Sequence, residues 1–254
     1  MPPTCASARA AFGHALEPVA GIALTVSVAA IIAVACDAEG RREIVGLHIG
    51  PSEAETFWAT FLKSLVKRGL KGVKLVVSDA HEGLKAAIAR VLGATWQRCR
   101  VHWMRNALAH VGKAQQSMAA AALRQAFLQP DQASARQTWR HVADQLRPRW
   151  PKLGKLMDDS EDDVLAYMAF PPQHRTKLHS TNPLERLNKE VKRRADVVGI
   201  FPSEASIIRL IGAVLLEAND EWQMQHRYMG VEAMGEMLNP PNTNENLQLP
   251  PKAA

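Results

Sequence analysis

Two acidic residues stand at positions where a carboxylate could either begin a helix or bind a metal ion. Asp79 follows the aliphatic run 73–77 after a single serine, and Glu82 lies three residues further along. This spacing predicts an N-cap and a capping box at the start of a helix. The alternative is chemistry, because an aspartate at the carboxyl end of a strand lies where open α/β sheets form their sites. The local pattern alone leaves both readings open.

Glu185 presents the same choice within the stretch HSTNPLERLNKEVKRR, residues 179–194. Asn182 is expected to cap a helix, with Pro183 at its first position and Glu185 at the reach-back position of a capping box. A carboxylate at the head of so basic a helix is either part of a solvated charge pair or a metal ligand beside bound phosphates. The predicted helix buries Leu184, Leu187 and Val191 and exposes Glu185, Asn188, Lys189 and Lys192 on the opposite side, with Arg193 and Arg194 close by.

Three further groups could do chemistry. Cys99 and His102 have the Cys-x-x-His spacing of half a zinc site, but no second pair at metal spacing follows. A closed zinc site is therefore not expected, and the alternatives are a packed pair at a strand–helix junction or support for an active site. His81 is a candidate for contact with a phosphate or with an ordered water. The acidic run 158–163 is interpreted as a solvated loop.

The charge balance favours an anionic partner. The 254 residues carry a formal net charge of +6 with a pI near 9.4, which favours nucleic acid over a membrane surface. Three cysteines at unrelated spacings do not form a disulfide framework and suit a reducing cytosol. The uncharged run 19–35 is predicted to be a buried strand, with a signal peptide or membrane anchor as the alternative.

The periodicity predicts an α/β fold with a helical insertion. The strands are expected at 26–35 and 42–49, joined as a hairpin across 37–40, then at 73–77 and from Thr95. The helices are expected from a Ser52 cap to Gly69 or Gly72, over 80–92, around 103–111, over 115–129, 131–150 and 161–170 in the insertion, from Asn182, and over 203–228.

Three motifs in the same order carry a resemblance to a known family. They read VVSDAHEGLKAAI, WQRCRVHWMRN and STNPLERLNKEVKRR, and a helical stretch separates the last two. Together they resemble the Mutator-type transposases of bacterial insertion sequences, over roughly residues 27–235. The resemblance implies an RNase H-like catalytic core interrupted by a helical insertion. It also implies an Asp, Asp, Glu triad that holds two divalent metal ions.

By this resemblance, Asp79 corresponds to the second aspartate and Glu185 to the glutamate, while Cys99 and His102 match the family's Cys-x-x-His signature. The implied cofactor is Mg²⁺ or Mn²⁺, since hard oxygen ligands suit these ions. Two such ions would neutralise the phosphodiester, activate the attacking oxygen and stabilise the leaving one.

The first aspartate of the triad has no counterpart. The resemblance places it near residues 11–17, where this sequence has Glu17 as its only acid, and no aspartate precedes Asp37. We therefore expect the first catalytic strand to be missing or replaced, which would make this chain a truncated transposase with a defective metal site. The alternative, Glu17 as a substitute ligand, would require close positional control.

The expected function is that of a DDE-class DNA transposase of an insertion sequence, defective as it stands. The rival is a non-enzymatic remnant that binds DNA or pairs with full-length transposase and dampens it. We expect DNA and a homo-oligomer or full-length transposase as partners, no membrane, and a cytoplasmic, nucleoid-associated location. The expected segments are a divergent N-terminus (1–24), the first part of the core (25–113), the helical insertion (114–178), the second part of the core (179–236) and a disordered tail (237–254). The expected DNA-binding residues are Asn182, Arg186, Lys189, Lys192, Arg193, Arg194 and Arg227.

Overall fold

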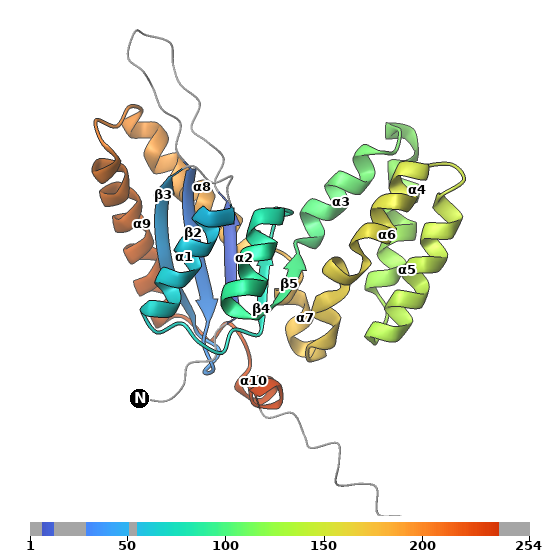
Figure 1. Cartoon of the computed structure of the whole chain (residues 1–254), viewed down its shortest axis with the longest axis horizontal. Helices are drawn as coiled ribbons and strands as arrows, with labels where there is room; N and C mark the ends of the chain where they lie inside the picture. Colours follow the sequence, from blue (N-terminus) through green and yellow to red (C-terminus); the bar gives the residue numbers. More distant parts are fainter. Residues whose placement is uncertain (1–6, 13–28, 51–54, 239–254) are drawn as a thin grey trace, which may run out of the picture.

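The computed structural model describes residues 7–12, 29–50 and 55–238 of the chain (Figure 1). Glu17, the predicted cap Ser52 and nearly all of the predicted tail lie outside these residues, as does the first part of the uncharged run 19–35. The last part of that run is a strand, as predicted. No helix within the described ranges is long and apolar enough to cross a membrane.

A five-stranded mixed sheet forms the centre of the molecule. Its strands are β1 (Ser7–Phe12), β2 (Ala29–Cys36), β3 (Arg42–Gly50), β4 (Leu75–Ser78) and β5 (Thr95–Arg98), in the order β3-β2-β1-β4-β5. The predicted hairpin is present, because β2 and β3 pair antiparallel on either side of the turn at 37–40. Strand β1 is antiparallel to β2 and parallel to β4, and β4 is parallel to β5.

Strand β1 lies at the centre of the sheet, between β2 and β4. Its sequence, SARAAF, contains no carboxylate. Arg9 pairs with Val77, and continuing this parallel register by two residues would bring Ala11 beside Asp79, which follows β4. The expectation that the first catalytic strand is missing or replaced stays a prediction, because residues 13–28 lie outside the described ranges.

Helices cover both faces of the sheet because its strands alternate their apolar side chains (Figure 1). Ile31 and Ala33 pack with Trp58 under α1 (Glu55–Lys67) and α2 (Glu82–Leu92). Ile32 and Val34 point the other way and pack against α8 (Asn182–Val198) and α9 (Glu204–Met224). The predicted last helix is therefore shorter than the expected 203–228, and a further helix, α10 (Val231–Leu238), was not predicted.

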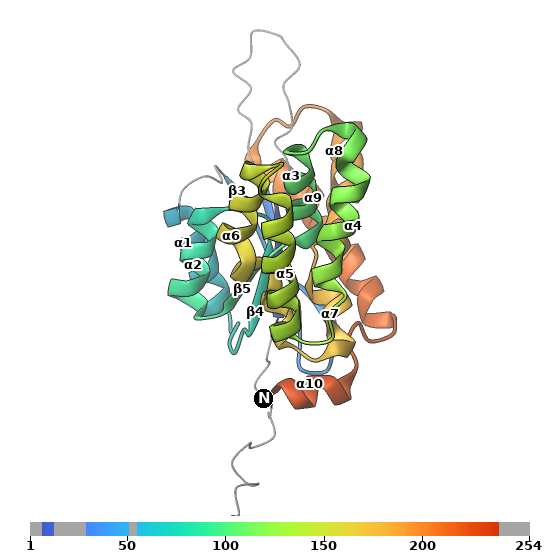
Figure 2. The same ribbon diagram turned by 90° about the vertical axis from the view of Figure 1, so that its right-hand side faces the viewer.

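The insertion is helical, as predicted, and stands beside the sheet (Figures 1 and 2). Trp103 on α3 and Trp139 on α5 are fully buried at its centre, with ring centroids 4.7 Å apart. The elements in chain order are α3 (Arg100–Ala109), η1 (Lys113–Gln115), α4 (Gln116–Phe127), α5 (Gln132–Leu146), α6 (Pro151–Leu165), η2 (Ala166–Ala169) and α7 (Pro172–Leu178).

One buried amide attaches the insertion to the sheet. Gln97 on β5 has no exposed surface. Its side chain donates to the carbonyl of Val164 at 2.9 Å and accepts from the backbone N–H of Tyr167 at 2.7 Å. Both partners are buried backbone groups that would otherwise be unpaired, so Gln97 fixes where the insertion leaves the sheet.

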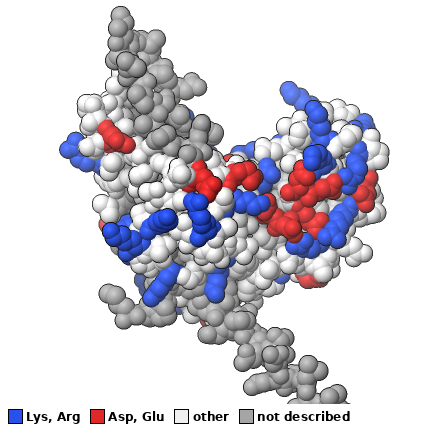
Figure 3. Space-filling view, viewed as in Figure 1, with Lys and Arg blue, Asp and Glu red and all other residues white. Residues whose placement is uncertain are grey.

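The acidic run 158–163 is not a loop, contrary to our interpretation; it lies within helix α6. Its charges alternate with basic residues of α5 on the surface of the insertion (Figure 3). Arg140, for example, pairs with Glu161 at 2.9 Å, and Arg147 pairs with Asp158 at 2.5 Å. Cations on the neighbouring helix thus stabilise the acidic run as part of a helix. These cations are distant in sequence, so the run alone did not indicate them.

Candidate functional site

The two acids singled out from the sequence lie on opposite sides of one imidazole. Nδ1 of His102 is 3.2 Å from Oδ1 of Asp79, and Nε2 of the same ring is 3.6 Å from Oε1 of Glu185. Nδ1 is buried and makes no hydrogen bond of normal geometry, so its contact with Asp79 is mainly electrostatic. The side chains of Asp79, His102 and Glu185 are 43%, 25% and 29% exposed, so solutes can reach the group.

Backbone hydrogen bonds hold together the three elements that carry this group. The N–H of Cys99, just after β5, donates to the carbonyl of Ser78 at the end of β4, 2.7 Å away. The N–H of Arg100 donates to the carbonyl of His179 at 2.8 Å, which brings the start of α3 against the segment before α8. The ends of β4 and β5 and the start of α8 are thus joined without any contact between charged side chains.

Cys99 lies at the centre of this junction, where its sulfur contacts both Thr181 and His102. Its side chain is fully buried, and its sulfur accepts from the backbone N–H of Thr181 at 3.4 Å. The Thr181 hydroxyl lies 3.3 Å from the sulfur and 3.4 Å from Oε1 of Glu185, within donating distance of either. Ligand atoms of Cys99, His102 and Glu185 all lie within 4.8 Å of one another.

The pKa values of Cys99 and His102 shift in opposite directions. Burial by itself raises the pKa of the Cys99 thiol, but hydrogen bonds with His102 and Thr181 outweigh it and lower that pKa below its usual value. The hydrogen bond with Cys99 raises the pKa of His102; burial opposes this rise, and the charges of Asp79 and Glu185 add to it.

Asp79 does not cap the helix that follows it, contrary to the first of our two readings. Helix α2 begins at Glu82, and its N-cap is His81, whose Nδ1 accepts from the N–H of Leu84 at 3.2 Å. The predicted capping box between Asp79 and Glu82 is therefore absent. His81 has the local role that the sequence gave to Asp79, which leaves the Asp79 carboxylate available for the cluster around His102.

The start of α8 also differs by one residue from the prediction. The N-cap is Thr181, with Asn182 as the first helical residue and Pro183 as the second. Thr181 makes no side-chain hydrogen bond to the helix backbone, and its hydroxyl points instead to Cys99 and Glu185. Thr181 is thus a site residue that the sequence reading missed, because its partner Cys99 lies 82 positions away along the chain.

The sequence model of the family described as "Transposase, Mutator family" matches residues 15–225. The chain belongs to the Mutator family of transposases. The chain is 46% identical over 210 residues to the transposase for insertion sequence element IS1081 of Mycobacterium tuberculosis, which covers 82% of this chain and 51% of that protein.

Other members of the Mutator family are similar over much of the chain. The identity is 38% over 221 residues with the transposase for ISRM5 of Rhizobium meliloti, covering 87% of this chain and 56% of the relative. It is 40% over 194 residues with the transposase for IS256 in transposon Tn4001 of Staphylococcus aureus, covering 75% and 50%. The chain therefore spans about half the length of the curated relatives it matches.

The predicted DNA-binding residues of this Mutator-family chain are exposed, but they differ in their surroundings. Asn182, Arg186, Lys189 and Lys192 lie along the exposed side of α8, and none of the three cations has an ion-pair partner among the described residues. Arg193 and Arg194 are already paired. Both bind Glu190, at 2.6 and 2.8 Å, and their hydrogen bonds lower the pKa of that carboxyl to about 2.

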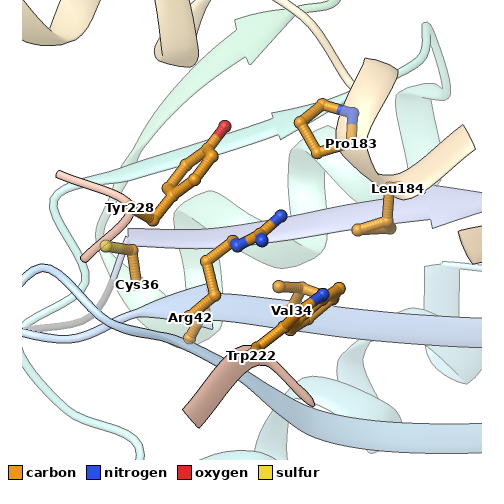
Figure 4. A pocket seen from close by; sticks show the side chains of 8 residues that line it. Val34, Cys36, Arg42, Pro183, Leu184, Trp222 and Tyr228 are labelled. Carbon is orange, nitrogen blue, oxygen red and sulfur yellow. The ribbon is translucent and has the colours of Figure 1, made fainter. Parts of the chain in front are cut away.

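Arg227 lies apart from α8 in sequence, in the exposed segment between α9 and α10. The next residue, Tyr228, lines a pocket together with Pro183 at the start of α8 (Figure 4). Arg42 also lines this pocket, with its guanidinium 4.3 Å from the Trp222 ring centroid and 4.6 Å from that of Tyr228. Cation–π contacts of this kind connect the start of β3, the end of α9 and the segment that carries Arg227.

Arg98 is a second residue that sequence reading missed. It ends β5, one position before Cys99, and is about half buried. Burial lowers its pKa, while the charge of Asp79 has the largest effect in the opposite direction. Its place at a strand end next to the Cys-x-x-His motif was the available signal, since cations beside paired acids are common where phosphates bind.

Proposed function

We propose that this chain forms the catalytic-core part of a DDE-class DNA transposase that acts on an insertion sequence, and that as it stands it lacks one metal ligand. Membership in the Mutator family supports DNA transposition as the function of this chain. The mixed sheet with a parallel β1–β4–β5 half, followed by a helical insertion, supports an RNase H-like core. Such a protein would work in the cytoplasm, at the nucleoid.

The observation that carries the proposal is the meeting of Asp79 and Glu185 across His102 at the head of a cationic helix. These acids come from segments 106 positions apart, and no capping function explains Asp79. A DNA strand along α8 would place its phosphates beside Arg186, Lys189 and Lys192. The next phosphates along the strand would then lie near Asp79 and Glu185. Phosphate contacts of this type position a duplex without reading its sequence.

The acids present do not by themselves fit a centre for two Mg²⁺ or Mn²⁺ ions. Such a centre needs several hard oxygen ligands shared between the ions. Within the described residues the two carboxylates are separated by an imidazole, and β1 adds no acid where it passes beside Asp79. We therefore expect weak binding of these ions and little or no strand transfer.

Replacing the missing ligand tests this proposal directly. The variant Ala11→Asp places a carboxylate on β1 at the register position beside Asp79. DNA that carries the ends of a related insertion sequence would be incubated with parent and variant in Mn²⁺, and nicked product measured. The matched control, Ala11→Asn, has nearly the same shape without the charge.

The expected result is cleavage by Ala11→Asp that disappears in the double variant Ala11→Asp with Asp79→Asn, and no cleavage by the Ala11→Asn control. Cleavage by the parent that is lost in Asp79→Asn would show that another acid already completes the site. Cleavage that survives Asp79→Asn would remove Asp79 from the chemistry and contradict the proposed site.

A non-enzymatic role is the second candidate, and the acid-free β1 favours it. A chain that binds DNA and cannot cut it would compete with a complete transposase for the same DNA or assemble with it. Mixing increasing amounts of this chain with an active relative would then reduce strand transfer. The parent chain should inhibit, whereas a variant that lacks Arg186, Lys189 and Lys192 should inhibit less if the competition is for DNA.

A further inference from the structure

We propose that Cys99, His102 and Glu185 form a binding site for Zn²⁺ or a similar transition-metal ion, with Asp79 as the residue that orients His102. This inference goes beyond the proposed DNA transposition and does not depend on it. It also changes our view of the Cys-x-x-His pair, because the third ligand comes from α8 and could not be found as a second pair at metal spacing.

The donor set is the first argument. A thiolate, an imidazole nitrogen and a carboxylate oxygen are the three donors that zinc sites use, whereas Mg²⁺ prefers oxygen ligands alone. Ligand atoms of the three residues lie within 4.8 Å of one another. Because His102 and Glu185 are partly exposed, three protein ligands would leave a fourth position for water or another oxygen.

The spacing is the second argument. Zinc–ligand bonds of about 2.0–2.3 Å in a tetrahedron place neighbouring ligand atoms about 3.3–3.7 Å apart. Nε2 of His102 and Oε1 of Glu185 are already 3.6 Å apart. The sulfur of Cys99 lies within 4.8 Å of the other two ligand atoms, so a shift of about 1 Å would bring it to the spacing of a zinc site.

The surroundings of the ligands are the third argument. Histidine ligands of zinc usually present their other ring nitrogen to a carboxylate, which fixes the ring. Here Nε2 faces Glu185, and Oδ1 of Asp79 lies 3.2 Å from Nδ1, close enough for the Nδ1–H to donate once the partly exposed Asp79 carboxylate turns towards it. Thr181 supplies a backbone N–H to the Cys99 sulfur, which favours the thiolate that a metal requires.

Bound zinc would join the end of β5 to the start of α8 by metal–ligand bonds. Because the metal binds the folded state, it should raise the thermal midpoint of unfolding by about 5–10 °C at a hundredfold excess over its dissociation constant. The same ion would occupy Glu185 and hold Asp79 beside His102, so it would exclude these acids from Mg²⁺.

Cobalt substitution tests the proposal in the full chain without DNA. Metal-free protein would be titrated with Co²⁺, and the thiolate-to-cobalt charge-transfer absorption recorded, followed by displacement with Zn²⁺. The matched pair of variants is Cys99→Ala and Cys36→Ala, because both cysteines are buried but Cys36 lies on β2 away from the cluster. Glu185→Gln is a third variant, since its partly exposed side chain can be exchanged with less risk to folding.

The expected result is a charge-transfer band in the parent and in Cys36→Ala, no band in Cys99→Ala, and at least tenfold weaker binding in Glu185→Gln. Zinc should raise the unfolding midpoint of the parent, and an equal concentration of Mg²⁺ should not. A parent without the band, or a band that survives in Cys99→Ala, would overturn the proposal. Because DNA is absent from these measurements, their failure would leave the proposed DNA binding untouched, and a failure to bind DNA would leave this site standing.

Discussion

The cations of α8 that have no ion-pair partner among the described residues should dominate DNA binding. We consider the triple variant Arg186→Gln, Lys189→Gln, Lys192→Gln, which removes three charges from one side of the helix. The residues are exposed and make no contact that the fold requires, so the variant should fold as the parent does. Binding of a duplex would be followed by fluorescence anisotropy at a series of salt concentrations.

The magnitude follows from counterion release. Each phosphate contact contributes about −0.9 to the slope of log K against log salt, so three lost contacts should make the slope shallower by about 2.7. Between 50 and 200 mM salt, the affinity of the parent should then fall about 40-fold more than that of the variant. The double variant of Arg193 and Arg194 should change the slope by less than the value of about 1.8 that two lost phosphate contacts would give. The reason is that Glu190 already binds both side chains.

The control removes three charges elsewhere. Lys63, Lys67 and Lys71 are exposed on α1 and just after it, on the opposite face of the sheet from α8. Changing all three to glutamine alters the net charge by the same amount and should shift the slope by less than one contact. Equal effects of the two triple variants would show that net charge alone, and not the α8 surface, drives binding, which would refute the reasoning.

Three further predictions concern the fold and the junction. Gln97→Leu should lower the free energy of unfolding by at least about 2 kcal/mol in urea titrations, because two buried backbone groups lose their partner. His81→Ala should lower it by about 1 kcal/mol through loss of the α2 cap, whereas His81→Ser should retain most of it; Asp79→Asn should leave the cap intact. Asp79→Asn should lower the pKa of His102 measured by NMR titration. Since the folded pKa of His102 is raised above 6.5, its protonation stabilises the fold fully below that pH and loses its effect as the pH rises through the folded value, and the variant should lose part of this dependence.

The regular elements were predictable because their signals are local. Strands β2, β3, β4 and β5 begin and end within a few residues of the expected positions, since runs of β-branched residues between turn signals are typical of buried strands. Strand β1 was not predictable in this way. Its sequence, SARAAF, has one aromatic residue and no β-branched one, so its pairing with β2 and β4, and not its own propensity, makes it a strand.

The helix starts show where local signals mislead. Asp79 and Asn182 were the better cap residues by type, yet His81 and Thr181 hold the cap positions. In both cases a tertiary contact decides the choice. At α2, Asp79 lies against His102 and the ring of His81 packs against Trp58 with centroids 5.5 Å apart; at α8, Thr181 donates its backbone N–H to the sulfur of Cys99.

The site itself could be predicted only as separate residues. Sequence reading found Asp79, Cys99, His102 and Glu185, but it treated the acids and the Cys-x-x-His pair as distinct groups. Their meeting depends on Thr181, a buried threonine whose backbone and hydroxyl bind the Cys99 sulfur. A residue of this kind has no motif, because its role is set by a partner far away in sequence. The same contact places the soft sulfur of Cys99 beside Glu185, the acid expected to bind Mg²⁺ or Mn²⁺. Because β1 carries no acid and Cys99 offers a sulfur, we expect this junction to bind zinc more strongly than Mg²⁺.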